Sequence, residues 1–331
     1  MTHFWRRVFL VSAGIAVASI TPAYANLIIN PIFDSTITSD ANAATIEATI
    51  DGAIQVYEAS FTDPITVNIQ FLEMGSGLGA SSTYYGTVTY STYRAALAAD
   101  ATTAADATAL ASLPATTNNP VDGSPNMDVT TANLRALGFN ANPPAGQPDG
   151  FIYLNTSIMN LDRISINPSK YDLMAVASHE MDEVLGFGSA LNGLSNGAAA
   201  PTGAVWGMDL YRYDQFGNRS FNTTLSSQAY FSINGGATDL AQFNQTAGGD
   251  FSDWYSTGPH TPQVQDAFGT PGSTPNLGVE LTGLDVLGYN LETSEPATAM
   301  LFGAALVVFG GLARRRARLS GQGDLERHGV V

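Results

Sequence analysis

The sequence predicts an α+β fold for the middle of the chain, residues 26–292, with a short targeting segment on either side. Two observations indicate this class. In the upper half, residues 26–189, strand-like apolar runs alternate with alanine-rich stretches of helical spacing. The lower half, residues 190–292, is rich in glycine and serine and contains only short strand-like pieces.

The upper half is expected to contain three strands and two helical regions before a final helix that carries polar residues. In chain order we predict a strand over 27–33, a helix over 41–58, a strand over 65–71, a glycine-rich segment over 75–82, a helical region over 90–113, a loop over 118–128 and a strand over 150–156. The glycine-rich segment lacks the lysine of a phosphate-binding loop.

The lower half is expected to form short strands joined by turns. The pieces MDLYRY, AYFSI and GVELTGL, over 208–213, 229–233 and 278–284, have strand-like composition. Between the first two, Asp214 and Arg219 flank Gly217, which predicts a hairpin turn closed by a salt bridge.

Composition and charge exclude several classes of function. Cysteine is absent, so the chain has no disulfide, no thiolate metal cluster and no cysteine nucleophile. The formal net charge is −16, and seven of the 13 basic residues lie in the two end segments, so the middle is strongly acidic. Such a surface argues against nucleic acid as a partner and favours divalent cations.

The N-terminal segment is typical of a secretory signal peptide. Arg6 and Arg7 precede an apolar run, and a small-x-small site ends at Ala25. We therefore expect residues 1–25 to be a signal peptide that directs export.

The C-terminal segment, residues 293–318, is expected to hold a short membrane span. Residues 297–313 form an apolar stretch without a charge, and the arginines at 314–316 follow at once, which places that end in the cytoplasm. With Glu295 and Pro296 in front, the segment resembles the bacterial PEP-CTERM sorting tail. The resemblance implies an exosortase-type partner, transient anchoring in the inner membrane and release to the cell surface or outside. An ordinary C-terminal anchor is the alternative, and residues 319–331 form a tail.

The final helix of the upper half contains SHEMDEVLGFGS, residues 178–189. Asn167-Pro168-Ser169 ends the preceding segment, so Ser169 is a candidate N-cap with Asp172 as its reciprocal partner. Gly186 is expected to end the helix, because glycine accepts the left-handed conformation found there.

At about 100° per residue, the helix presents two neighbouring faces, with Asp182 pointing away from both. The apolar face consists of Leu173, Met174, Ala177, Met181, Val184 and Leu185. His179 and Glu183 lie one turn apart on the other face, a spacing that brings an imidazole and a carboxylate to one metal ion. Glu180, at the border of the two faces, is then placed to take a proton from water activated by the metal. The simpler alternative is an i,i+4 ion pair.

The same stretch resembles the active-site helix of metzincin-type zinc proteases, H-E-x-x-H-x-x-G-x-x-H/D. His179, Glu180 and Gly186 match the pattern, whereas Glu183 and Ser189 replace two of its ligands. Most of residues 26–291 also resembles a group of bacterial PEP-CTERM proteins regarded as metalloproteases. The resemblance implies a zincin-like catalytic domain that hydrolyses peptide bonds.

The third metal ligand is expected from the lower half of the chain. Asp253, in GGDFSDWYS, stands where related zincins are expected to carry a histidine, and it is the first choice. His260 is the second choice, and Asp250 and Asp266 follow. The stretch Val264–Phe268 is a candidate for the turn beneath the metal.

These inferences support three hypotheses. The first is a surface-sorted metallopeptidase that acts on protein or peptide substrates, with Glu180 as general base and a metal held by His179, Glu183 and either Asp253 or His260. Zinc is the expected metal, but a set of one histidine and two carboxylates should hold zinc less selectively than three histidines, so manganese and calcium are alternatives. The second is a non-catalytic matrix or adhesion protein on a degenerate zincin scaffold. The third is a surface protein whose helix carries only an ion pair.

Overall fold

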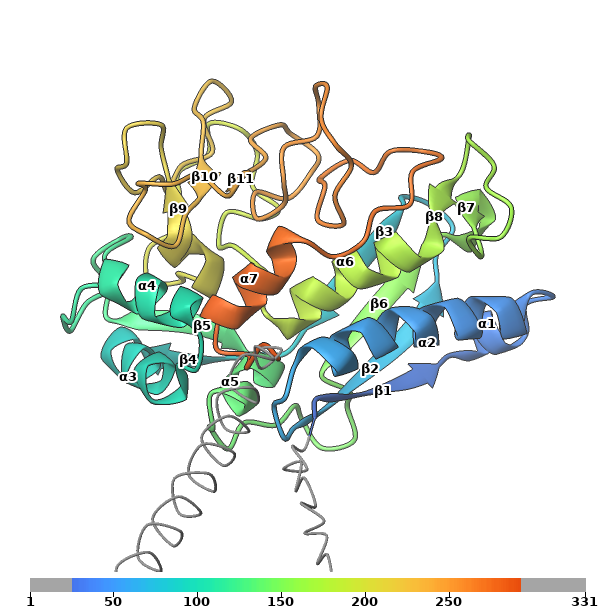
Figure 1. Cartoon of the computed structure of the whole chain (residues 1–331), viewed down its shortest axis with the longest axis horizontal. Helices are drawn as coiled ribbons and strands as arrows, with labels where there is room; N and C mark the ends of the chain where they lie inside the picture. Colours follow the sequence, from blue (N-terminus) through green and yellow to red (C-terminus); the bar gives the residue numbers. More distant parts are fainter. Residues whose placement is uncertain (1–25, 293–331) are drawn as a thin grey trace, which may run out of the picture.

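A computed structural model describes residues 26–292 and confirms the α+β class (Figure 1). Within this range the chain forms seven α-helices and several small sheets, and none of these helices combines the length and apolar character needed to cross a membrane. The predicted signal peptide (1–25), sorting segment (293–318, with its span at 297–313) and tail (319–331) lie outside the described residues.

The main sheet has four strands in the order β1-β2-β6-β3. Strands β1 (Ile28–Phe33), β2 (Thr66–Glu73) and β6 (Gly150–Leu154) are parallel, and β3 (Gly79–Thr83) pairs antiparallel with β6 at one edge. The three predicted strands of the upper half are therefore confirmed within a few residues. The edge strand lies in the predicted glycine-rich segment, where alternating small residues allow a pleated strand.

Helices α2 (Ala43–Ser60) and α6 (Leu173–Leu185) lie side by side on one face of this sheet (Figure 1). The short helix α1 (Ser35–Thr38) precedes them. Tyr57 of α2 is fully buried, and its hydroxyl donates to the Ser178 carbonyl or to Oδ1 of Asp182 on α6, both at 2.8 Å. This polar contact within an apolar interface fixes how α6 is rotated over the sheet.

Two predictions for residues 90–130 need correction. The helical region over 90–113 is two helices, α3 (Tyr90–Asp100) and α4 (Ala104–Ser112), because Thr103 and Asp106 form a capping box that starts the second one. The predicted loop over 118–128 ends in a strand, β5 (Asn126–Thr130), which pairs with β4 (Tyr85–Thr89). Helix α5 (Thr131–Ala136) follows β5 directly.

The lower half is loop-rich, as predicted, but its elements differ from the expected strands. Its elements are the 3₁₀ helix η2 (Gly207–Tyr211), strands β9 (Arg212–Tyr213), β10 (Tyr230–Phe231) and β11 (Ala241–Gln242), and helix α7 (Val279–Val286). The strand predicted over 278–284 is wrong: Gly283 lets the segment coil against the Phe187 ring, since a Cβ there would lie 2.3 Å from it.

The predicted turn after residue 213 exists, but its predicted salt bridge does not. Tyr213 and Arg219 pair across the turn, and Asp214 accepts hydrogen bonds from the backbone amides of Phe216 and Asn218. Arg219 instead donates to the Leu210 carbonyl and stacks over the Tyr213 ring, 4.9 Å from its centroid. Backbone donors thus satisfy the carboxylate that a cation was expected to pair.

A second small element precedes α6 at the end of the sheet. The 3₁₀ turn η1 (Thr156–Ile158) leads into β7 (Met159–Asn160), which pairs in parallel with β8 (Tyr171–Asp172). Because β8 runs directly into α6, this short pairing sets where the helix begins.

We expect Tyr57→Phe to lower the free energy of unfolding by about 1–3 kcal/mol, because it leaves the buried carboxyl of Asp182 without its donor. Urea unfolding followed by circular dichroism measures this difference. Tyr85→Phe is the matched control, since Tyr85 is 56% exposed and its loss of a hydroxyl should leave the midpoint in place. Equal midpoints for the two variants would contradict the role assigned to Tyr57.

Candidate metal centre

Helix α6 begins and ends at defined caps. Its N-cap is Asp172, which accepts a hydrogen bond from the Ala175 amide at 3.2 Å and pairs with Arg163 at 2.5 Å. The expected cap, Ser169, is therefore wrong, because Tyr171 and Asp172 are held in β8 and delay the first helical turn. Gly186 ends the helix as predicted, with φ of 129°.

The side of α6 that was expected to point away from both faces is also buried. Asp182 is fully buried against Tyr57 of α2. Burial and the nearby charge of Glu280 raise the pKa of the Asp182 carboxyl well above its usual range. Helix α6 is therefore buried on most sides, and the face that carries His179 is the one partly exposed to solvent.

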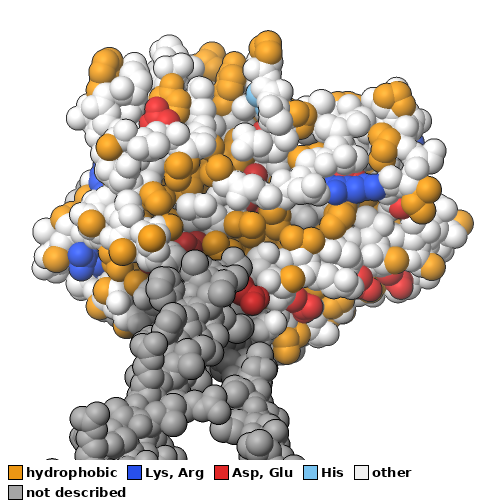
Figure 2. Space-filling view, in the orientation of Figure 1, with side chains coloured by type: hydrophobic (Ala, Val, Ile, Leu, Met, Phe, Trp, Pro, Cys, Tyr) orange, Lys and Arg blue, Asp and Glu red, His pale blue; other side chains and the backbone are white. Residues whose placement is uncertain are grey.

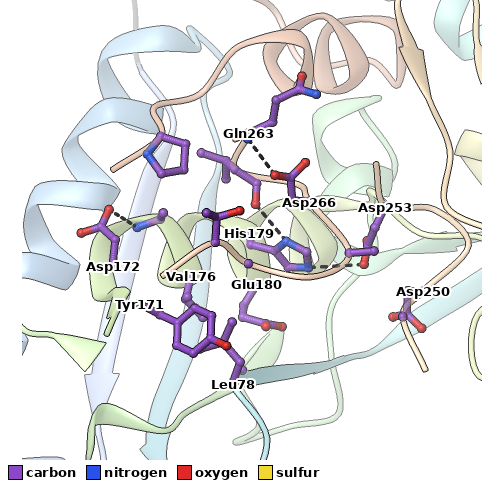
Figure 3. Close-up of a pocket in the computed structure, with 18 of the residues that line it drawn as sticks. Leu78, Tyr171, Asp172, Val176, His179, Glu180, Asp250, Asp253, Gln263 and Asp266 are labelled. Atoms are coloured by element: carbon purple, nitrogen blue, oxygen red, sulfur yellow. Dashed lines mark hydrogen bonds and ion pairs between the residues drawn. The ribbon is translucent and has the colours of Figure 1, made fainter. Parts of the chain in front are cut away.

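His179, Glu183 and Asp253 converge in the structure. Figure 3 shows the His179 ring beside Asp253. His179 Nε2 lies 3.9 Å from Glu183 Oε1 and 3.7 Å from Asp253 Oδ2, and one ligand atom from each residue lies within 4.8 Å of the others. These separations are longer than a charge-assisted hydrogen bond of about 2.7–2.9 Å. They match donor atoms that surround one cation at about 2.0–2.6 Å each.

The ring of His179 is oriented by the lower half of the chain. Its Nδ1 lies 3.0 Å from the carbonyl oxygen of Val264, an arrangement in which Nδ1–H donates. In the neutral imidazole, Nε2 then carries the lone pair and faces the two carboxylates, as metal-binding histidines require. The stretch Val264–Phe268 thus contacts the candidate centre, in line with its predicted place.

Two further side chains orient the carboxylates. Ser81 on β3 donates to Oε2 of Glu183 at 2.6 Å, and Gln265 Nε2 donates to Oδ1 of Asp253 at 3.0 Å. Each bond leaves the other carboxylate oxygen directed at His179. Sequence reasoning missed both residues, because a single serine or glutamine carries no motif, and only the pairing of distant segments brings it to the site.

Glu180 lies in a narrow space between α6 and the edge strand. It is 5% exposed, and a Cβ on Gly79 would stand 2.3 Å from its Oε1. Gly79 therefore makes room for this carboxyl group. Burial and the charge of Glu183 raise its pKa well above the usual range, while the imidazole of His179 acts in the opposite direction.

The remaining candidates lie elsewhere or at the margin. His260 Nε2 bonds to Asp266 Oδ2 at 2.8 Å, and its Nδ1 bonds to the Gly258 carbonyl, so it is not part of the His179 cluster. Ser189 donates to Asp209. Asp250 lies near Glu183, whose charge adds to burial in raising the pKa of Asp250 to about 6.

The candidate centre opens into a groove along β3. One cavity of about 300 Å³ is bordered by residues 78–81 of this edge, and a second of about 360 Å³ is bordered by residues 81–83. Ser81, Glu183 and Asp250 line both cavities, whereas His179 and Asp253 line the first one, so Glu183 is the member of the cluster that lies between the two. No lysine or arginine in the described part of the chain lines either one.

The outer edge of β3 has free backbone groups. Asn155 donates to the Leu78 carbonyl and Tyr84 donates to the Asp149 carbonyl, so the even-numbered residues of this segment bond to the β6 side. By the alternation of an antiparallel pair, the backbone N–H and C=O of Gly79 and Ser81 point outward into the groove.

Basic side chains are sparse around the site. On the face shown in Figure 2 they occupy a few separate places. Six of the 13 basic residues belong to residues 26–292, and Arg212, one of the six, is 1% exposed. The imidazole of His179 is therefore the basic group that faces the carboxylates of the cluster. Burial lowers the pKa of this imidazole, but Asp253, Glu180 and Glu183 raise its pKa to about 10.

The sequence matches no known family profile, no curated protein and no solved structure.

We expect Gly79→Ala to lower the free energy of unfolding by about 1–3 kcal/mol, because its Cβ must displace the Glu180 carboxyl or the Val176 side chain. Thermal unfolding measures the change. Gly75→Ala is the matched control: its Cβ would have nothing within 4 Å, so no loss is expected. A neutral effect of Gly79→Ala would show that Glu180 is not confined as described.

Proposed function

We propose that this chain is an exported metal-dependent endopeptidase, with a cation held by His179, Glu183 and Asp253 and with Glu180 as general base. The observation that carries the proposal is the convergence of these three ligand types, from two distant segments, beside a buried glutamate in an open groove. The metzincin-like pattern of residues 178–189 is consistent with it.

The charge of the cluster supports a cation. Four carboxyl groups, from Glu180, Glu183, Asp250 and Asp253, are crowded around one imidazole. Burial raises the pKa of Asp253 to about 8, a change to which Glu183 and Asp250 contribute. Removing carboxylates from water is costly unless a positive charge compensates them, and a divalent ion supplies that charge.

A divalent cation held by His179, Glu183 and Asp253 would polarise a carbonyl group and lower the pKa of water. Glu180 adjoins the three ligands, so its carboxylate is placed to accept the proton of the attacking water. The carboxyl then returns this proton to the leaving amine. The confinement of Glu180 beside Gly79 keeps it in position for both transfers.

The groove supports a peptide as substrate. Free backbone groups of Gly79 and Ser81 match those of an extended chain, which can add as a further strand to an exposed sheet edge. The two cavities continue on both sides of Glu183, so the cluster meets such a chain in its interior rather than at its end. This arrangement favours endopeptidase activity.

The ligand set also bears on the metal. One imidazole and two carboxylates form a harder and more negative set than three histidines. Zinc remains the first choice, and manganese and calcium are the alternatives.

We further propose that the signal peptide and the sorting tail deliver the protein to the cell surface through an exosortase-type enzyme.

The metal is tested on the full chain after chelator treatment and re-equilibration with Zn²⁺, Mn²⁺ or Ca²⁺. Elemental analysis should find about one tightly bound ion per chain. Asp253→Ala and Glu183→Ala should each lose it, because each removes a ligand. His260→Ala is the matched control and should retain the ion, since His260 bonds to Asp266 instead. Equal losses from Asp253→Ala and His260→Ala would disprove this ligand set.

The general base is tested with Glu180→Gln, which keeps the shape and removes the charge. Cleavage of unfolded peptides, scored by new termini in mass spectrometry, should fall by about 10²–10⁴-fold while the bound ion remains. Asp266→Asn, in the same cavity, should change cleavage little. A wild-type chain that binds the ion and cleaves nothing would favour the non-catalytic scaffold instead.

A further inference from the structure

Glu280 is a buried carboxylate without a cationic partner among the described residues. It lies in α7 and is 1% exposed. Three neutral donors satisfy it: Oε1 accepts from the Trp254 indole and the Gln265 amide, both at 3.0 Å, and Oε2 accepts from the Gly278 amide at 2.7 Å. Burying a carboxylate costs free energy unless its oxygens are hydrogen-bonded, so these three donors are needed to hold Glu280 in place.

Two of these donors belong to segments that form the candidate centre. Trp254 follows Asp253 in the chain. Gln265 follows Val264, whose carbonyl orients His179, and its own side chain donates to Asp253. One carboxylate oxygen of Glu280 therefore contacts both segments that reach His179 from the lower half.

Backbone bonds join the same two segments to each other. The Trp254 amide donates to the Gln265 carbonyl at 2.7 Å, and the Ala267 amide donates to the Trp254 carbonyl at 3.0 Å. The Trp254 ring also packs edge-on against Phe187, with centroids 5.3 Å apart. The two segments therefore pack as one unit between the end of α6 and α7, and Glu280 accepts a hydrogen bond from each segment.

A helix-capping role explains only part of this arrangement. Capping of α7 requires the bond from Gly278 to Oε2. It does not require Oε1 to accept from an indole and an amide that lie 26 and 15 residues away in the sequence. Those two bonds instead set the position of Asp253 and of the Val264 carbonyl relative to His179.

We propose that Glu280 is a positioning residue for the candidate centre, which through Trp254 and Gln265 holds Asp253 and the Val264 carbonyl in register with His179. Its effect on metal affinity rests on the proposed function, whereas its effect on the His179 ring does not. Partners of this kind change metal affinity by about 10–100-fold when they are removed.

The test compares Glu280→Gln and Glu280→Met in the full chain. Glutamine keeps one neutral acceptor and methionine keeps none, at similar size. In metal-free protein labelled with ¹⁵N-histidine, the His179 Nδ1 proton should exchange slowly in the wild type, at a similar or slightly higher rate in Glu280→Gln, and about 10-fold faster in Glu280→Met, because only methionine removes the acceptor of both bonds. In parallel, the Kd for Zn²⁺ should rise by about 10–100-fold in Glu280→Met.

Asp149→Asn controls for a merely structural effect. Asp149 is equally buried at 1% and accepts from Arg135, Thr131 and the Asn68 amide, but it lies outside both groove cavities. It should lower the thermal midpoint without faster exchange of the His179 proton. Trp254→Phe removes the indole donor to Glu280 together with part of a buried ring, and it should give an intermediate exchange rate.

The outcomes separate this inference from the proposed function. Unchanged exchange in folded Glu280→Met would overturn the positioning role, whatever the chain binds. The same holds if Asp149→Asn accelerates exchange as much as Glu280→Met does. Accelerated exchange in Glu280→Met would support the role even if the wild type binds no Zn²⁺, a result that would count against the proposed function alone.

Discussion

The geometry of the candidate centre depends on one of the hydrogen bonds between the two halves of the chain, from His179 Nδ1 on α6 to the carbonyl of Val264. The imidazole comes from the helix that packs on the sheet, and the carbonyl comes from the loop-rich half. Because the bond fixes one ring nitrogen, the other is directed at Glu183 and Asp253. The groove, Glu180 and the edge strand β3 all lie on the side of the helix to which this second nitrogen points.

Buried carboxylates characterise this protein more than any apolar feature does. Asp182, Glu180, Asp253 and Glu280 lie around α6 or directly beneath it, each at most 5% exposed. Their partners differ. Asp182 accepts a hydrogen bond from the Tyr57 hydroxyl, and Glu280 accepts from backbone amides and an indole. Glu180 and Asp253 lie beside the imidazole of His179. Glu180 and Asp253 line the cavity of about 300 Å³, so a cation bound there, as proposed, would be placed to compensate their charge.

Sequence patterns predicted the local parts of this arrangement. Period and composition located β1, β2, β6 and the motif helix, and Gly186 marked its end. The preference for Asp253 over His260 agrees with the cluster in the structure, although ligation itself stays a prediction. Ser81, Gln265 and Glu280 could not be predicted, because their roles depend on which segments meet. The prediction of a strand where α7 lies was wrong, because Gly283 disfavours a helix and the β-branched residues of this segment favour a strand, whereas the packing of Gly283 against the Phe187 ring depends on a distant part of the chain.

The edge strand has a consequence for selectivity. The groups that Gly79 and Ser81 direct outward belong to the main chain, and every polypeptide has their complement. A strand edge of this kind would recognise a peptide by its extended backbone rather than by its side chains. On the proposed function, we expect folded neighbours, whose own backbone is already paired, to be spared, and frayed termini and unstructured linkers to be accepted. Such a preference would direct the protein towards damaged or unfinished chains.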